Sequence, residues 1–268
     1  MNERHQEQVD LAQGSVTLLA FDTSTAAFSA AIVKDGERID STVSFAERNH
    51  SVRIVSELKE LLARNGMSPE QLDGIAVGQG PGSYTGVRIA VTAAKTLAWA
   101  WNKPLVGVSS LESLALGAWD AIRANETVKG ETWIVPLMDA RRGQVYTSRH
   151  VADGDGRWVR ADGDGIRLIA DWAPHLERLA FEAEHQGVAA IWFVGELLPA
   201  HLDAIEQANE AGRVPLRTLP CDVSAAAAGR IGERRVRAGE RDDAHAFVPN
   251  YTQLAEAEAK LLAASRGE

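Results

Sequence analysis

A glycine-rich segment, Gly78–Arg88, is the part of the chain whose residue types and spacing could most readily bind a charged group. It reads Gly-Gln-Gly-Pro-Gly-Ser-Tyr-Thr-Gly-Val-Arg and lies between a predicted strand and a predicted helix, where larger side chains would block a tight turn. Its Ser83 is placed to cap that helix, whose first N–H groups could face an anion. Two interpretations stay open: a capped turn packed against the other half of the protein, or a phosphate loop of Gly80, Gly82, Ser83, Thr85 and Gly86.

The segment that follows the first predicted strand is the second candidate for binding phosphate. It consists of Asp22, Thr23, Ser24 and Thr25, whose hydroxyl and backbone N–H groups could hold phosphate while the carboxylate holds magnesium through water. Asx-turns and ST-turns of the same composition are common in hairpins. The four residues alone therefore fit a structural turn as well as a phosphate loop.

No catalytic or metal-binding arrangement stands out in the rest of the chain. The seven histidines include no pair four residues apart and no H-E-x-x-H pattern. A Gly-x-Ser-x-Gly nucleophile motif is absent, and the single cysteine, Cys221, excludes an internal disulfide and a cysteine-based zinc site. The run that begins at Asp153 departs from a calcium loop, with Trp158 in place of glycine and Asp164 in place of glutamate. We therefore predict no catalytic residues and no metal site.

The elements that must position these loops follow from the hydrophobic pattern. In the first half, three strand-like runs precede a helix, a strand, a second helix and another strand, and an Asp35-Gly36 pair marks a hairpin. This order predicts a mixed sheet with helices packed on it. The predicted strands are 16–21, 26–33, 38–45, 72–78 and 104–108, and the predicted helices are roughly 48–65 and 83–101.

The second half repeats this order more loosely. Its predicted helices are 111–123, 172–185, 199–209, 223–237 and a terminal 253–264, and its predicted strands are 133–138, 144–151 and 190–194. The Gly- and Asp-rich stretch 153–165 is predicted to be a loop. We therefore expect two closely packed α/β lobes with a boundary near residues 105–110 and no linker between them.

Composition limits the classes of partner. Hydrophobic residues make up 45% of the 268 residues and charged residues 24%, which is typical of a globular chain. A formal charge of −9 argues against holding nucleic acid or an anionic membrane by bulk charge. The polar beginning and the absence of a run near the roughly 18 apolar residues of a membrane span lead us to expect a cytoplasmic protein.

Several blocks, taken together, carry a family likeness. They are Leu-Ala-Phe-Asp-Thr-Ser-Thr at 19–25, His50-Ser51, the glycine-rich block 78–90, Met-Asp-Ala-Arg-Arg-Gly-Gln-Val-Tyr at 138–146, and a weaker Val-Pro-Asn-Tyr at 248–251. In this order they resemble the TsaB (YeaZ) family, the bacterial partners of the TsaD enzyme in making threonylcarbamoyladenosine in tRNA. The likeness covers residues 16–150 and leaves out the first fifteen residues, and 153–245 contains no diagnostic motif.

The resemblance implies a fold. It is a duplicated RNase H-like α/β fold of the actin, Hsp70 and sugar-kinase (ASKHA) type, which agrees with the two lobes expected from the pattern. We accordingly divide the chain into a flexible polar lead (1–15), a first lobe (16–108), a second lobe (109–245) and a tail with a helix (246–268) that returns to the first lobe.

The resemblance also implies a non-catalytic role. TsaD-like relatives bind their catalytic metal through two histidines four residues apart, just after the strand that follows the glycine-rich helix. Here those positions hold Ser110 and Leu114, and leucine cannot ligate a metal. We therefore expect a scaffold subunit that activates TsaD for modification of adenosine 37 in tRNAs that read ANN codons. This chain would need no cofactor, although the two loops leave room for weak ATP or ADP binding in the complex.

The family likeness places the partner interface on the two first-lobe helices. The partners it implies are TsaD in a heterodimer, TsaE in a larger complex, and a second copy of the chain in isolation, with tRNA contacted only indirectly. An ATP-dependent phosphotransferase of the same superfold is the alternative, and a metallopeptidase is a third hypothesis. The predicted interface residues are Val52, Ile54, Val55, Leu58, Leu61, Val87, Arg88, Val91, Ala94, Leu97 and Trp101.

Overall fold

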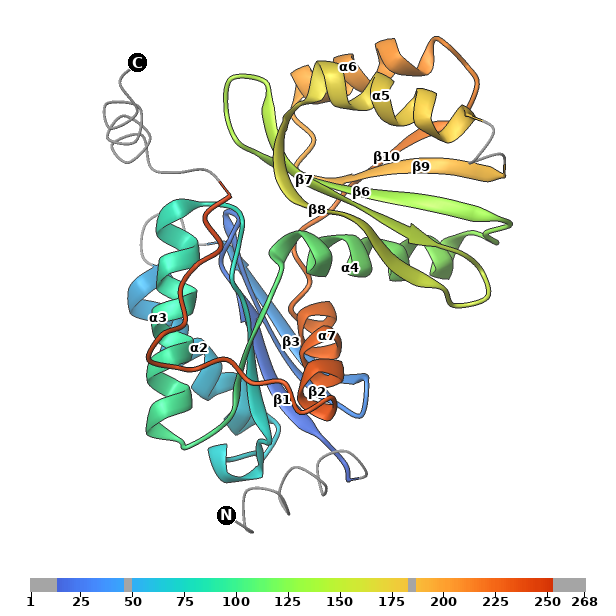
Figure 1. The fold of residues 1–268 in the computed structure, drawn as a ribbon. Helices are drawn as coiled ribbons and strands as arrows, with labels where there is room; N and C mark the ends of the chain where they lie inside the picture. The colour runs from blue at the N-terminus through green and yellow to red at the C-terminus, as the bar shows by residue number, and fades with distance from the viewer. Residues whose placement is uncertain (1–13, 46–49, 183–186, 253–268) are drawn as a thin grey trace.

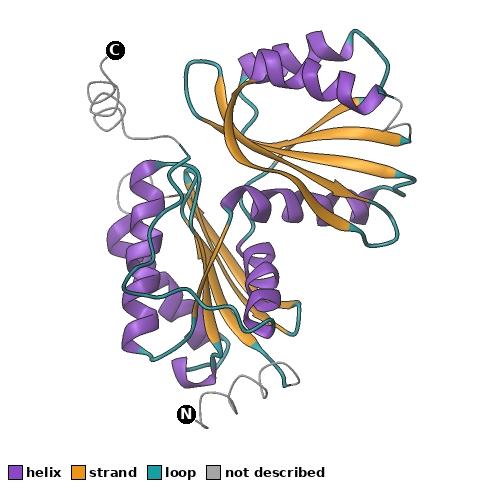
Figure 2. Cartoon of the chain, viewed as in Figure 1, coloured by secondary structure: helices purple, strands orange, loops and turns teal. Residues whose placement is uncertain are grey.

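The described residues of the computed structural model are 14–45, 50–182 and 187–252, with the backbone alone for 50–53. Within them the chain forms two five-stranded sheets, each flanked by helices (Figures 1 and 2). The predicted lead falls almost entirely outside these ranges, and so does the predicted terminal helix 253–264. None of the helices in the described ranges is long and apolar enough to span a bilayer.

The first sheet has the strand order β3-β2-β1-β4-β5. Strand β1 pairs antiparallel with β2 and parallel with β4, β2 pairs antiparallel with β3, and β4 pairs parallel with β5. A one-turn 3-10 helix, Pro69–Gln71, precedes β4. The strands are β1 (Thr17–Asp22), β2 (Ala27–Lys34), β3 (Glu37–Phe45), β4 (Gly74–Gly78) and β5 (Leu105–Val108), and the helices between them are α2 (His50–Arg64) and α3 (Tyr84–Ala100).

The second sheet repeats this topology strand for strand. Its order is β8-β7-β6-β9-β10, with β7 antiparallel and β9 parallel to the central strand β6. The strands are β6 (Glu131–Asp139), β7 (Gln144–Ala152), β8 (Trp158–Leu168), β9 (Val188–Gly195) and β10 (Leu216–Pro220), and the helices between them are α5 (Ile169–Phe181) and α6 (Pro199–Asn209). The predicted duplicated α/β fold is therefore confirmed.

Two further helices cross between the lobes. Helix α4 (Ser110–Asn125) follows the last strand of the first sheet but packs on β6, β7 and β9 of the second. Helix α7 (Ala225–Arg237) follows the last strand of the second sheet but packs on β1, β2 and β4 of the first, and it also contacts α4. The predicted boundaries at 108 and 245 stay predictions; the structure adds that α7 covers the first sheet.

The central strand β1 is buried on both faces because of this crossing. Its Leu19 and Phe21 pack with α2 and α3, whereas Leu18 and Ala20 face α7. The cluster that contains Leu18 also includes Ile134 of β6, so one core joins the two sheets. Alternate side chains of a strand point to opposite faces, which explains why β1 is apolar throughout.

The residues after α7 form a strap that returns along the first lobe, visible as the red trace beside α3 in Figure 1. The N–H of Asp242 donates to the carbonyl of Leu105 at 2.8 Å, and Lys95 Nζ donates to the carbonyl of Phe247 at 2.8 Å. The Asn250 N–H donates to the carbonyl of Gln79 at 2.7 Å. The described part of the predicted tail, 246–252, therefore contacts the first lobe.

Two strands differ from the sequence prediction. The prediction of a loop at 153–165 is wrong, because Trp158–Leu168 forms β8 and pairs along β7. Its glycines and aspartates have low strand propensity, which pairing overrides; Asp162, for example, bonds Arg149 of β7 at 2.6 Å. Strand β10 was not predicted, because only Leu216 of its five residues is buried.

We predict that Gly229→Leu lowers the free energy of unfolding by about 1–3 kcal/mol, since overpacking forces side chains and backbone to move. A Cβ at Gly229 would lie 2.5 Å from Val33 Cγ2 and 3.2 Å from Ala20 Cβ. Chemical denaturation checks this, with Arg234→Leu on the exposed face of the same helix as control. Equal unfolding midpoints for the two variants would contradict the close packing of α7 on the first sheet.

Candidate functional site

Asp22, at the end of β1, is a sealed carboxyl group and not a free ligand. Its side chain is 1% exposed; Oδ2 accepts a hydrogen bond from Ser110 Oγ at 2.6 Å, and Oδ1 accepts one from the Ser24 N–H at 2.6 Å. A Cβ at Gly78 would lie 1.7 Å from Asp22 Oδ2, which explains the glycine there. Burial raises the pKa of Asp22 above its ordinary value of 3.8, although both hydrogen bonds oppose this.

The two candidate phosphate loops pack against each other. Thr23 Oγ1 donates to the carbonyl of Gly86 at 2.7 Å, and the Ser83 N–H donates to the carbonyl of Ser24 at 2.7 Å. A Cβ at Gly82 would lie 2.3 Å from the Ser24 carbonyl oxygen, and one at Gly86 would lie 1.9 Å from the Thr23 carbonyl oxygen. The glycines of this motif thus allow close contact between two loops.

The start of helix α3 is capped from within the chain. Ser83 Oγ accepts from the Gly86 N–H at 3.3 Å, as the sequence predicted for a capping serine. The Gly80 N–H donates to Ser110 Oγ at 3.1 Å. These bonds correspond to the capped turn that the sequence left open as one of two interpretations. Nucleotide affinity of the loops stays a prediction.

Ser110 and Leu114, the two positions at which the family likeness led us to look for metal-binding histidines, are both buried. Ser110 begins α4 and bonds Asp22, while Leu114 lies one turn later in the core that joins the sheets. A leucine in that core has no atom that can bind a metal. Within the described ranges, no three histidine, cysteine or acidic side chains are placed to hold a metal ion.

A cleft of about 810 Å³ lies between the lobes, beside these loops. One wall comes from the loops of the first lobe, and the other from the turn after β6, with Tyr146 and Glu196. The Asp139 Oδ1 accepts from the Arg141 N–H at 3.1 Å, and the Asp139 N–H donates to Glu196 Oε2 at 2.9 Å. The sequence predicted strands at 133–138 and 144–151 and marked 138–146 through the family likeness, but it assigned no chemistry to this turn.

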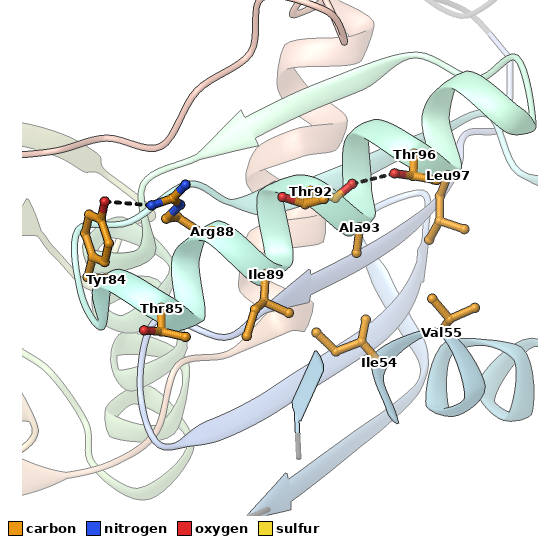
Figure 3. Close-up of a pocket in the computed structure, with 10 residues that line it drawn as sticks. All are labelled: Ile54, Val55, Tyr84, Thr85, Arg88, Ile89, Thr92, Ala93, Thr96 and Leu97. Atoms are coloured by element: carbon orange, nitrogen blue, oxygen red, sulfur yellow. Dashed lines mark hydrogen bonds between the residues drawn. The ribbon is translucent and has the colours of Figure 1, made fainter. Parts of the chain in front are cut away.

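A second hollow of about 510 Å³, mostly apolar, lies between α2 and α3 (Figure 3). Its walls are two rows of α3 side chains spaced four residues apart, and the row that contains Ile89 and Ala93 points toward Ile54 and Val55 of α2. Val55 is 41% exposed and Tyr84 is 55% exposed, and the Tyr84 hydroxyl accepts from Arg88 Nη1 at 2.7 Å. We call this surface the α2–α3 groove; its α3 residues are Tyr84, Thr85, Arg88, Ile89, Thr92, Ala93, Thr96 and Leu97.

The predicted interface residues divide between the core and the groove. Ile54 and Leu97 line the groove but are themselves buried in the core of the first lobe, Val55 and Arg88 are exposed in the groove, and Trp101 is half-buried. The Val52 side chain lies outside the described residues. The remaining predicted residues are buried in the core of the first lobe: Leu58, Leu61, Val87, Val91 and Ala94.

Sequence reasoning missed most of the accessible groove. Most of the residues that it selected are apolar at helical spacing, and these are buried in the core of the first lobe. The groove instead uses small and hydroxyl side chains such as Thr92, Ala93 and Thr96, which do not stand out by hydrophobicity. These residues lie at four-residue spacing from Tyr84 and Ile89, and this spacing is the sequence signal from which the groove could have been predicted.

We predict that Asp22→Asn is more stable than the wild type at pH 7. Because the pKa of Asp22 is raised in the folded state, its contribution to the free energy of unfolding is fully present below pH 3.8. This contribution is lost as the pH rises through the folded-state pKa, since the carboxyl group must then ionise in a buried site. The advantage of the variant should therefore shrink toward acid pH. Urea unfolding across this range checks it, with the exposed Asp155→Asn as control. A variant that is less stable at every pH would show that the fold needs the charged form.

Comparison with known proteins agrees with the fold and the sequence blocks. A family model described as "TsaD: tRNA N6-adenosine threonylcarbamoyltransferase" matches residues 43–261. The chain is 33% identical over 249 residues to the tRNA threonylcarbamoyladenosine biosynthesis protein TsaB of Bacillus subtilis (strain 168), covering 92% of this chain and 98% of that protein. It is 38% identical to TsaB of Escherichia coli (strain K12) over 149 residues, covering 56% of this chain and 61% of that protein.

Solved structures give the same relationship. YeaZ from Pseudomonas aeruginosa matches with a TM-score of 0.64 and 27% identity, over 88% of this chain and 99% of that chain. A second Pseudomonas aeruginosa structure, described as an uncharacterized protein with similarity to peptidase YEAZ, matches with a TM-score of 0.65 and 26% identity, over 89% and 100% of the two chains. By its match over nearly the whole length of TsaB of Bacillus subtilis, its duplicated sheets and its paired loops, the chain belongs to the TsaB (YeaZ) family of tRNA threonylcarbamoyladenosine biosynthesis proteins.

Proposed function

We propose that this chain is a non-catalytic subunit that binds a TsaD-type threonylcarbamoyltransferase and supports modification of adenosine 37 in tRNAs that read ANN codons. The observation that carries the proposal is the α2–α3 groove in a member of the TsaB family. The heterodimer works in the cytoplasm, TsaE joins it in a larger complex, and the groove pairs two copies of the chain when TsaD is absent.

The groove has the properties of a helix-binding surface. Its α3 rows at four-residue spacing form ridges into which the side chains of another helix can pack. Ala93 and Thr92 are small enough to let a second backbone approach, while Val55 and Tyr84 offer apolar area at its edges. A partner that presents an amphipathic helix pair would complete a bundle with α2 and α3.

The interior of the chain supports a subunit without chemistry of its own. Asp22 is sealed by Ser110, and Leu114 stands where a metal ligand would be needed. A net charge of −9 suits a protein that supports an RNA-binding partner and contacts tRNA only indirectly. It needs no cofactor for this role, and any ATP or ADP binding in the complex is weak.

The rival hypothesis, an ATP-dependent phosphotransferase, requires the two loops to hold phosphate. In the structure Thr23 and Ser83 bond the opposite loop, and Asp22 has no exposed oxygen to offer a magnesium-bound water. Magnesium-dependent ATP turnover that is lost in Asp22→Ala would favour this rival over the scaffold.

We predict that Ala93→Glu abolishes co-elution with a TsaD-type protein in size-exclusion chromatography. The substitution places an unpaired carboxylate in the middle of the groove, and its desolvation weakens binding at least about tenfold. The control is Ala200→Glu, exposed on α6 of the second lobe, which should co-elute like the wild type. Two persistently separate peaks for the wild type would overturn the proposed function, and unchanged binding by Ala93→Glu would exclude the groove.

A further inference from the structure

The α2–α3 groove and the interlobe cleft are one continuous surface. Tyr84, Thr85 and Ile89 line both hollows, so the surface turns around the first turn of α3 and enters the space between the lobes. Its character changes along the way, from mostly apolar in the groove to a cleft lined by Thr25, Ser83 and other hydroxyl groups. A partner that binds in the groove can therefore extend into the polar cleft between the lobes.

Arg141 stands on the far wall of this continuation. It is exposed, and its guanidinium makes no ion pair with any carboxylate of the described residues. The two acidic residues of the same wall are engaged with the turn itself: Asp139 accepts from the Arg141 N–H, and Glu196 accepts from the Asp139 N–H. The turn thus uses its carboxylates internally and leaves an arginine side chain unpaired at the cleft.

The backbone of this turn is held in an uncommon conformation. Arg141 and Arg142 have φ angles of 68° and 55°, in the left-handed region that few residues other than glycine adopt. The Ala140 N–H bonds the Gln144 carbonyl, and the Gln144 N–H bonds the Arg141 carbonyl, each at 2.9 Å. Strain of this kind persists only where its surroundings impose it, and it is concentrated at functional sites. The backbone of Arg141 is therefore fixed before a ligand arrives, and it sets the direction in which the side chain leaves the turn.

We propose that the segment of the partner that continues from the groove carries an aspartate or glutamate side chain into the cleft, where it pairs with Arg141. A planar guanidinium recognises a carboxylate through two parallel hydrogen bonds. On a chain of net charge −9, one unpaired arginine inside a cleft also selects where an acidic segment can bind. This inference rests on the proposed function, because the same partner must occupy the groove.

The test compares Arg141→Gln with Arg142→Gln in the binding of a TsaD-type protein, measured by titration calorimetry at low and high salt. Both positions have left-handed backbones and are exposed, but Arg142 does not line the cleft, so it is a matched control for charge and strain. Arg141→Gln should weaken binding about tenfold and reduce its salt dependence, while Arg142→Gln stays within about twofold of the wild type.

The outcomes separate the inference from the proposed function. No binding by the wild type overturns the proposed function. Normal wild-type binding with equal effects of the two variants overturns the inference alone. A photo-crosslinking residue at Thr25 should capture a partner peptide that contains an acidic residue, and capture of none overturns the inference as well. Binding of inorganic phosphate or acetate by the wild type alone, lost in Arg141→Gln, would replace the partner segment with a small-molecule site.

Discussion

The exchange of helices between the two lobes is the constraint on which the rest of the molecule depends. Each sheet needs both faces covered, and one of its covering helices is α4 or α7 from the other half of the chain. The buried face of β1 therefore exists only when the two lobes are joined. This is why one apolar core runs from Leu18 to Ile134, and why Gly229 must be a residue without a side chain.

The contacts around Asp22 also depend on this exchange of helices. Helix α4 begins at Ser110, where the chain crosses to the second sheet, and the serine hydroxyl donates to the buried carboxyl of Asp22. The glycines then bring the two loops into contact, so the polar groups of the loops bond one another. The outer face of α2 and α3 and the cleft beside it are the accessible surfaces that the proposed function uses.

Hydrophobic periodicity in the sequence was enough to predict α2 and α3, and continuous apolar runs marked β1 and β2. Strand β3 has no buried residue, and it was the Asp35-Gly36 hairpin signal that located it. It failed at β8, where Gly163 and Gly165 lower strand propensity and only pairing with β7 decides the structure. The glycine-rich loop could be located because few residues other than glycine fit such a turn. The hydrogen bond between Asp22 and Ser110 could not be predicted from the sequence, because 88 residues separate the two and neither is unusual by itself.

The strap after α7 has a consequence for how the first sheet meets other chains. Strand β5 is an edge strand, and an edge with free N–H and C=O groups invites a further strand from another molecule. Here Asp242 bonds both the Leu105 carbonyl and the Gly107 N–H, and Arg235 donates to the Gly107 carbonyl. Aggregation by strand addition is therefore blocked at this edge by residues that lie more than a hundred positions later in the sequence.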